Sequence, residues 1–127
     1  AVAQIALSAE RDREPAPPSF AQCRRVARAL RYIEAHSADD CSLETLADDA
    51  KLGRYHFLRV FRAITGQTPR QHVIATRLRA AASALRTSRT PITRVALETG
   101  FLDPSHFTAT FARAFGVSPR AYRKHAR

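Results

Sequence analysis

Apolar residues recur every three to four positions along most of the chain, which is the spacing of one buried face on an α-helix. The first clear pattern follows Ser19, a residue type that caps helix N-termini, and continues to about His36. Further helices are predicted over 43–50, after Ser42, and over 54–65. No stretch of useful length alternates apolar and polar residues as a half-buried strand does, so the pattern predicts an all-α fold. In the first helix the apolar face consists of Phe20, Cys23, Val26, Ala27, Leu30 and Ile33.

Four pairs of residues predict the starts of the remaining helices, because proline fits the first turn of a helix and the side chain before it caps the N-terminus. The pairs are Thr68-Pro69, Thr90-Pro91, Asp103-Pro104 and Ser118-Pro119. The first pair opens a long alanine-rich helix to about Arg86, the third opens a helix over 104–115, and the last helix ends near His125. We therefore expect about seven helices.

One unit of the chain is repeated at an offset of fifty residues. Residues 56–61 read HFLRVF and residues 106–111 read HFTATF, and each copy is followed at the same distance by a glycine and then by a proline. In the first copy Phe57 and Phe61 lie on the buried face, and in the second the series Phe107, Phe111 and Phe115 has helical spacing. The repetition predicts one supersecondary unit that is used twice.

Each copy has the features of a helix-turn-helix motif. The shorter helix ahead of it contains a small residue, Ala47 or Ala96, at the point where the second helix crosses it. In the second copy Gly100 can adopt the positive φ that the turn requires. Lys51 takes that place in the first copy, where we expect it to tolerate the turn at some energetic cost.

The positive charge of the chain is concentrated in the repeats. Of the formal net charge of +10, residues 1–49 carry −3 and residues 50–127 carry +13. Arginine supplies 19 of the 21 basic residues, and its planar guanidinium suits phosphate oxygens and guanine edges better than a lysine ammonium does. The charge distribution therefore favours a nucleic-acid partner for the repeated part.

The sequence gives no sign of a metal site or of an enzyme. Cys23 and Cys41 lack the spacing of a zinc motif, no two of the five histidines lie within four residues of each other, and no Asp or Cys cluster completes a metal site. His56 and His106 occupy equivalent positions in the two copies, and we interpret them as residues that pack at the helix start and hydrogen-bond a neighbour. A glycine-rich phosphate loop and a nucleophile with its base are also absent from the sequence. We therefore expect no metal, no cofactor and no enzymatic activity.

No apolar run approaches the about 18 residues that span a bilayer, and we expect a cytoplasmic protein without membrane contact. The chain begins at Ala1 and contains no methionine, which suggests a longer protein with a further domain upstream.

The sequence resembles the AraC/XylS family of bacterial transcription regulators over roughly 19–123. The residues that carry the resemblance in the first copy are His56-Phe57, Arg59, Phe61, Thr65-Gly66, Thr68-Pro69 and then Arg77-Leu78. In the second copy they are Gly100-Phe101, Ser105-His106-Phe107, Phe111 and the run from Phe115 to Arg123, FGVSPRAYR. The last block is the most specific part of the signature.

The resemblance implies two helix-turn-helix subdomains joined by a long helix, in a protein whose other domain senses an effector or dimerises. On this basis we expect a first subdomain over 19–67, a linker helix over 68–87 and a second subdomain over 88–127. Residues 1–18, which contain a charge run and several prolines, would be an interdomain linker or the tail of a missing N-terminal domain.

A connecting helix of seventeen or eighteen residues is about 26 Å long at ~1.5 Å per residue. With the width of each subdomain added, two recognition helices at 54–65 and 104–115 could lie about 34 Å apart, which is one turn of B-DNA. One chain could then contact two successive major grooves. Because the copies differ in sequence, the DNA site should be asymmetric.

The base-reading positions implied by the family fall on two unequal sets of side chains. The first copy has Tyr55, Leu58 and Arg59, and the second has Pro104, Ser105, Thr108 and Ala109. Arg59 can bond guanine N7 and O6, while Tyr55 and Leu58 can contact thymine methyl groups. For the second helix we expect Ser105 and Thr108 to act mainly through phosphates at the helix N-terminus.

Arginines in or beside the two motifs, and on the helix between them, are the candidates for contact with DNA phosphates. They are Arg62, Arg77, Arg79, Arg89, Arg94 and Arg113.

These observations predict a protein that binds double-stranded DNA at specific sequences and regulates transcription, with RNA polymerase as a partner if it activates. Repression by occupancy of the site is the other mode that the sequence leaves open. The main alternative is a basic helical module that docks an acidic protein partner, and a small helical enzyme is a more distant one.

Overall fold

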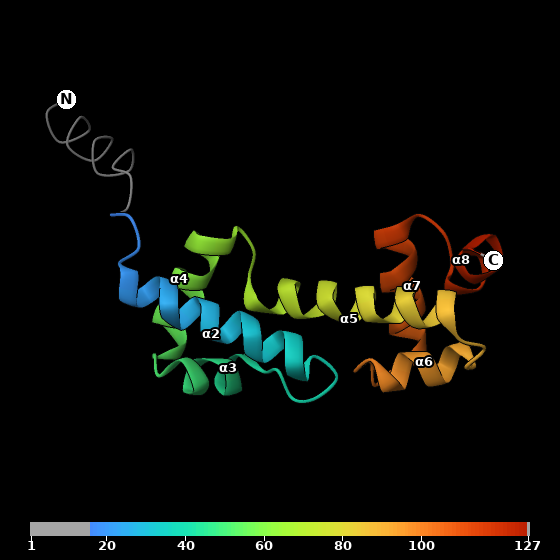
Figure 1. The fold of residues 1–127 in the computed structure, drawn as a ribbon, viewed down its shortest axis with the longest axis horizontal. Helices are drawn as coiled ribbons and strands as arrows, with labels where there is room; N and C mark the ends of the chain where they lie inside the picture. Colours follow the sequence, from blue (N-terminus) through green and yellow to red (C-terminus); the bar gives the residue numbers. More distant parts are fainter. Residues whose placement is uncertain (1–15, 127) are drawn as a thin grey trace, which may run out of the picture.

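The computed structural model describes residues 16–126, and these residues form seven helices and no strand (Figure 1). The helices are α2 (Phe20–His36), α3 (Leu43–Ala50), α4 (Arg54–Thr65), α5 (Pro69–Thr87), α6 (Ile92–Glu98), α7 (Pro104–Phe115) and α8 (Pro119–Ala126). The predicted all-α fold is therefore confirmed. Most of the linker expected over 1–18 lies outside the described residues.

Two hydrophobic cores lie at opposite ends of α5. The first core, formed by α2, α3 and α4, takes Val73 from the beginning of α5. The second core, formed by α6 and α7 with Tyr122 of α8 against it, takes Leu78, Ala81, Ala82 and Leu85 from the rest of α5. We call α2–α4 the first subdomain and α6–α8 the second. Figure 1 shows α5 running along the length of the molecule from one to the other.

The predicted helix boundaries follow local capping. Ser19 and Thr68 each form a reciprocal capping box with the glutamine three residues later. The carboxylate of Asp103 accepts a hydrogen bond from the backbone N–H of Ser105 at the start of α7. At the other end of the two recognition helices, Gly66 and Gly116 adopt the left-handed conformation, with φ of 76° and 78°. These short-range contacts explain why the sequence pattern located the helices correctly.

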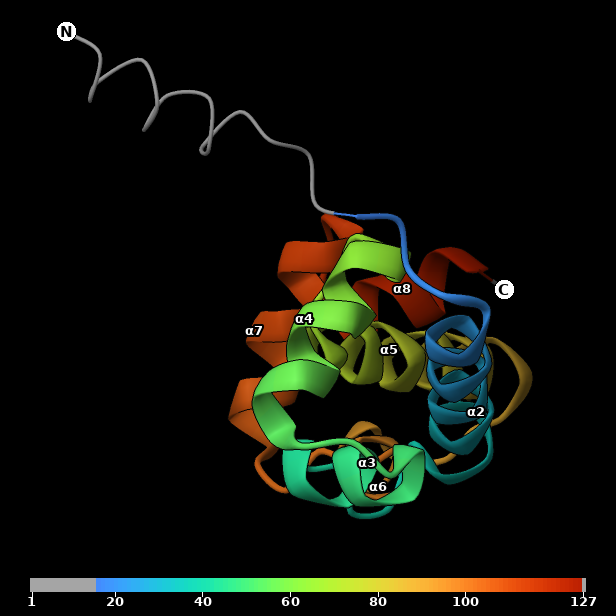
Figure 2. The same ribbon diagram turned by 90° about the vertical axis from the view of Figure 1, so that its left-hand side faces the viewer.

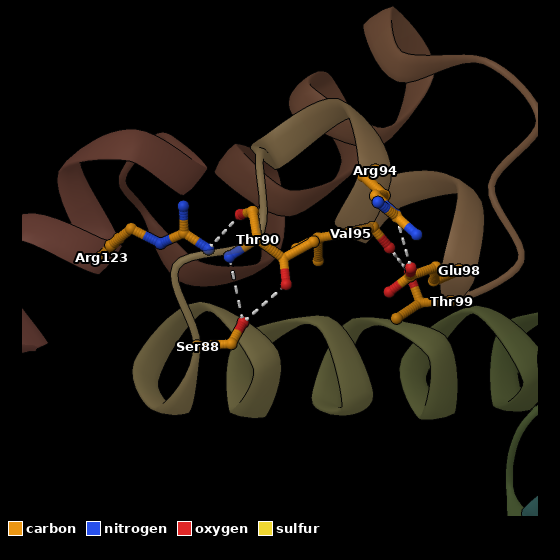
Figure 3. A network of polar contacts seen from close by, with 7 residues as sticks. All are labelled: Ser88, Thr90, Arg94, Val95, Glu98, Thr99 and Arg123. Carbon is orange, nitrogen blue, oxygen red and sulfur yellow. Dashed lines mark hydrogen bonds and ion pairs between the residues drawn. The ribbon is translucent and has the colours of Figure 1, made fainter.

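One predicted cap is wrong. Thr90 does not cap α6, because the N-cap position is Pro91 and no side chain bonds to the helix N-terminus there. The Oγ of Ser88 donates to the hydroxyl of Thr90 over 3.2 Å and accepts from the Thr90 N–H over 3.4 Å (Figure 3). The Thr90 carbonyl also accepts a bond from Arg123 of 2.6 Å. Thr90 is thus part of the link between α5, α6 and α8.

Two aromatic residues of the predicted apolar faces are exposed. Phe20 is 78% exposed, and the guanidinium of Arg24 lies 5.6 Å from its ring centroid. At 100° per residue Phe20 falls roughly 150° from the centre of the buried stripe of α2, so the assignment to the apolar face was wrong. Phe115, at the end of α7, is 38% exposed, although its ring stacks on Phe111 with centroids 4.4 Å apart.

Candidate nucleic-acid interface

Helices α4 and α7, the second helices of the two motifs, lie on the same side of α5. Figure 2, a view along the long axis, shows them running in the same general direction, with α2 on the other side of the molecule. The two short helices α3 and α6 also overlap in this view, so the motifs follow one another in tandem along α5. The arrangement presents two helices to one side of the molecule.

Each of these helices is anchored by a pair of buried phenylalanines. The rings of Phe57 and Phe61 are fully buried, with centroids 5.6 Å apart, and those of Phe107 and Phe111 are fully buried, with centroids 5.7 Å apart. Because these rings determine which face of the helix points inward, they also determine which side chains point outward. The repeated aromatic pair therefore orients the candidate base-reading residues.

The outward face of α4 carries all three of its predicted base-reading residues. Tyr55 is 91% exposed, Arg59 is exposed and Leu58 is half-buried. Within residues 16–126 the Arg59 guanidinium has no hydrogen bond or ion pair, so it is available to a ligand. The N-cap residue of the helix is Gly53, so no side chain caps the N-terminus of α4.

The outward face of α7 is smaller and more polar. Ser105, Thr108 and Ala109 are exposed, and Pro104 is half-buried. The Thr108 hydroxyl donates to the carbonyl of Pro104 over 3.0 Å. The backbone N–H of Ser105 already donates to the Asp103 carboxylate over 2.9 Å, and this carboxylate places a negative charge at the start of the helix. This contact leaves less of the N-terminus of α7 for a phosphate than the sequence suggested.

The candidate phosphate-binding arginines differ in what they contact. Four of them, Arg62, Arg79, Arg89 and Arg113, are exposed and have no ion pair within the described residues. Arg94 is also exposed, and its Nε lies 2.9 Å from a Glu98 carboxylate oxygen (Figure 3). An exposed pair of this kind contributes little to stability and can exchange for a phosphate.

Arg77 has a structural role that the sequence did not reveal. It is half-buried, and its Nε donates to the carbonyl of Ser37 over 2.6 Å while Nη2 donates to the carbonyl of Asp39 over 3.0 Å. These acceptors lie about forty residues earlier in the chain, in the loop between α2 and α3. No local pattern could indicate such a contact.

The two repeated histidines lie at the starts of the recognition helices. Nε2 of His56 is 3.4 Å from the side-chain nitrogen of Gln22, and the ring of His106 lies 6.2 Å from that of Phe101, between centroids. Residues 16–126 contain no group of three or more His, Cys, Asp or Glu side chains that could hold a metal ion. In the same part of the chain no helix is both long and apolar enough to cross a membrane.

Known proteins match most of the chain. A family model described as a helix-turn-helix domain matches residues 46–125. The MmsAB operon regulatory protein of Pseudomonas aeruginosa is 34% identical over 96 residues, which cover 76% of this chain and 31% of that protein. The transcriptional activator RhaS of Escherichia fergusonii is 35% identical over 100 residues, which cover 79% of this chain and 36% of that protein. The chain thus spans about a third of the length of these curated relatives.

Solved structures share the fold. The DNA-binding domain of AdpA, a global transcriptional factor solved in complex with a target DNA, is 36% identical with a TM-score of 0.72, covering 86% of this chain and 95% of that one. The C-terminal domain of AraT, a response regulator from Geobacillus stearothermophilus, is 29% identical with a TM-score of 0.75, covering 80% and 84%. The chain therefore belongs to the AraC family of transcription regulators and carries the DNA-binding domain of that family.

Proposed function

We propose that the chain binds an asymmetric site on duplex DNA, with α4 and α7 in two successive major grooves. The observation that carries this proposal is the placement of both helices on one side of α5, each with its outward face determined by buried aromatic residues. The nineteen residues of α5 correspond to about 28 Å at ~1.5 Å per residue. With the width of the subdomains added, this length is compatible with a groove repeat of about 34 Å.

The two helices have unequal roles in this proposal. Arg59 bonds N7 and O6 of a guanine, and Tyr55 and Leu58 contact thymine methyl groups beside it. In α7, Ser105 and Thr108 reach phosphates or base edges with short side chains, and Ala109 offers no hydrogen-bonding group. Most of the sequence preference should therefore come from α4, and α7 should contribute mainly affinity.

Five arginines, in or beside the two motifs and on the helix between them, supply the contacts with phosphates. They are Arg62, Arg79, Arg89, Arg94 and Arg113. We leave Arg77 out of this set, because two of its donors already bond backbone carbonyls. The scarcity of acidic residues after position 49 leaves this charge largely uncompensated.

We propose that DNA binding by this chain regulates transcription from neighbouring promoters, as the names of its relatives suggest for those proteins. A further domain that binds an effector or dimerises, and contact with RNA polymerase, belong to the same proposal. Because the bacterial chromosome lies in the cytoplasm, we place the protein there. The relatives are regulators, and we assign no enzymatic activity to the chain.

Selection of bound duplexes from a random pool tests the proposal. We expect one asymmetric sequence with two elements about 10 base pairs apart, centre to centre. Recovery of a palindrome, or of a single element, would contradict the use of both helices. If no duplex sequence is enriched and Arg59→Ala binds DNA as the wild type does, the chain is instead a basic module for an acidic protein partner.

A further inference from the structure

Three parts of the molecule meet at the middle of α5. Arg77 projects from α5, which both subdomains share, and its guanidinium bonds the loop between α2 and α3 of the first subdomain. The acceptors are the backbone carbonyls of Ser37 and Asp39, at 2.6 and 3.0 Å. A guanidinium presents its donors as a rigid fork, so it can hold two carbonyls at once. The contact ties the first subdomain to the linker helix beyond the first core.

The second subdomain reaches the same place through Gly100. A Cβ added to this glycine would lie 2.7 Å from Nε of Arg77, 3.0 Å from the carbonyl oxygen of Ser37 and 3.1 Å from Cα of Ala38. Gly100 lies in the turn between α6 and α7, so the turn of the second motif packs directly on the arginine and on the loop of the first subdomain. The main helix–helix contacts, by contrast, lie within one subdomain or with α5.

The loop that Arg77 bonds also contains short-range hydrogen bonds of its own. The carboxylate of Asp40 accepts from the N–H of Ser42 over 3.0 Å and from the hydroxyl of Thr45 over 2.9 Å, at the start of α3. Through this cap the loop is connected to α3 and therefore to α4. The groove at the junction is lined by Leu58 of α4 and His106 of α7, so it lies between the two recognition helices.

We infer that Arg77 is a positioning residue that joins the two subdomains and thereby determines the separation and relative rotation of α4 and α7. It selects the spacing between the two DNA elements that the chain accepts, without touching DNA itself. This inference rests on the proposed use of both helices in successive grooves. A single helix linking the subdomains, without this lateral contact, would allow them to bend and twist relative to each other.

The spacing preference is the readout that a merely stabilising residue would not change. The 127-residue chain is titrated with duplexes that carry the selected site and variants with one base pair inserted or removed between the two elements. One base pair changes the relative rotation of the elements by roughly 35°. The wild type should lose about tenfold in affinity on each altered duplex, comparable to one mismatched base pair.

Arg77→Met should reduce that loss to about threefold or less, because subdomains released from each other can adapt to either spacing. Arg86→Met is the matched control, since Arg86 also lies on α5 but bonds the hydroxyl of Tyr122 within the second subdomain. It removes the same charge and should keep the steep wild-type profile. Arg77→Lys keeps the charge without the fork and should give an intermediate profile. An Arg77→Met profile as steep as that of the wild type overturns the inference.

A measurement without DNA separates this inference from the proposed function. Spin labels on the exposed residues Ala63 of α4 and Ala114 of α7, in a chain with Cys23→Ser and Cys41→Ser, report the distance between the recognition helices. The distribution should be narrow in the wild type and in Arg86→Met, and broader in Arg77→Met and Arg77→Lys. Equal widths in all four proteins, with helicity retained, overturn the inference. Failure of the wild type to select any duplex contradicts only the proposed function.

Discussion

Lys51 and Gly100 occupy the same position in the two helix-turn-helix turns. Each donates its backbone N–H to the carbonyl three residues earlier, over 3.1 and 3.2 Å, and the residue after each bonds the carbonyl five residues earlier. Both have positive φ, 57° for Lys51 and 106° for Gly100. The same turn is therefore built once with a lysine in the left-handed region and once with a glycine whose missing side chain makes room for Arg77.

Replacement of Lys51 by glycine should stabilise the chain. The left-handed conformation costs a residue with a side chain about 1–2 kcal/mol. Glycine avoids this cost but adds entropy to the unfolded chain, and the net gain in stability should be about 0.5–1 kcal/mol. The carbonyl of Lys51 that accepts from Arg25 over 2.7 Å is retained in this variant. Thermal unfolding measures the gain. Asp48→Gly, in the adjoining helix, should instead destabilise by about 1 kcal/mol, and a loss in both variants would contradict the strain at Lys51.

Gly100→Ala should be clearly more harmful than Gly66→Ala. Both glycines have positive φ, but a Cβ at Gly66 would meet nothing within 4 Å, whereas at Gly100 it would lie 2.7 Å from Arg77. Gly66→Ala should therefore cost about 1 kcal/mol from backbone strain alone. Gly100→Ala should cost about 2–4 kcal/mol, because the side chain must also displace Arg77 or the loop. Urea unfolding of the two variants compares these costs. Equal losses of unfolding free energy would show that Arg77 and the loop move aside without an energetic cost.

Arg59→Ala should weaken binding to the preferred duplex by about 1–3 kcal/mol and change binding to random DNA little. The reason is that a bidentate contact with guanine exists only on the correct base pair. Fluorescence anisotropy on both duplexes measures the difference. Arg62→Ala is the comparison, since loss of a phosphate contact should weaken binding to both sequences alike. Equal losses for Arg59→Ala on both duplexes would make Arg59 a backbone contact.

The salt dependence of binding should count the phosphate contacts. Each phosphate that the protein neutralises contributes a slope of about −0.9 in log K against log salt concentration. Arg113→Gln should therefore make the slope shallower by about one, on specific and random duplexes alike. Arg31→Gln should leave the slope unchanged, because Arg31 is exposed and lies on α2 opposite the buried stripe that packs against α3 and α4. A change of slope in Arg31→Gln would move the basic interface to another face.

Asp40 should make stability fall in acid. The N–H of Ser42 and then the hydroxyl of Thr45 bond its carboxylate and lower the pKa of Asp40 below the ordinary value. For a lowered pKa the stabilisation is complete above the ordinary aspartate pKa and is lost as the pH falls through the lowered value. Asp40→Asn keeps an acceptor but does not titrate. Its deficit in unfolding free energy should shrink below about pH 4, and a deficit independent of pH would contradict this assignment.

The features that could be predicted from the sequence are those determined by residues close together in the chain, namely the helix starts and the buried faces of the helices. Ser19 and Thr68 mark helix starts because their side chains bond backbone groups three residues away. The aromatic repeat indicated which faces of α4 and α7 point inward, and those rings are buried as expected. The roles of the base-reading and phosphate-binding residues remain predictions. Whether side chains such as Arg59 and Arg113 contact DNA depends on where the duplex lies, and that is not determined by the contacts within the chain.

Contacts between distant segments could not be predicted in the same way. Threonine is a residue type that often caps helices, but Thr90 does not cap α6. Its hydroxyl accepts from Ser88 and its carbonyl accepts from Arg123, so Thr90 links α5, α6 and α8. The bonds from Arg77 to the loop at Ser37 and Asp39 join residues about forty positions apart. Such contacts follow from the way the two cores pack on one helix.

Because the two motifs follow one another in tandem along α5, a bound chain has a defined direction along the DNA. A protein with a twofold axis looks the same from either direction along the double helix, but this chain has α2 at one end and α8 at the other (Figure 1). Inverting its site in front of a gene would therefore turn α2 toward the opposite flank. The orientation of the site, and not only its presence, should matter for the promoter beside it.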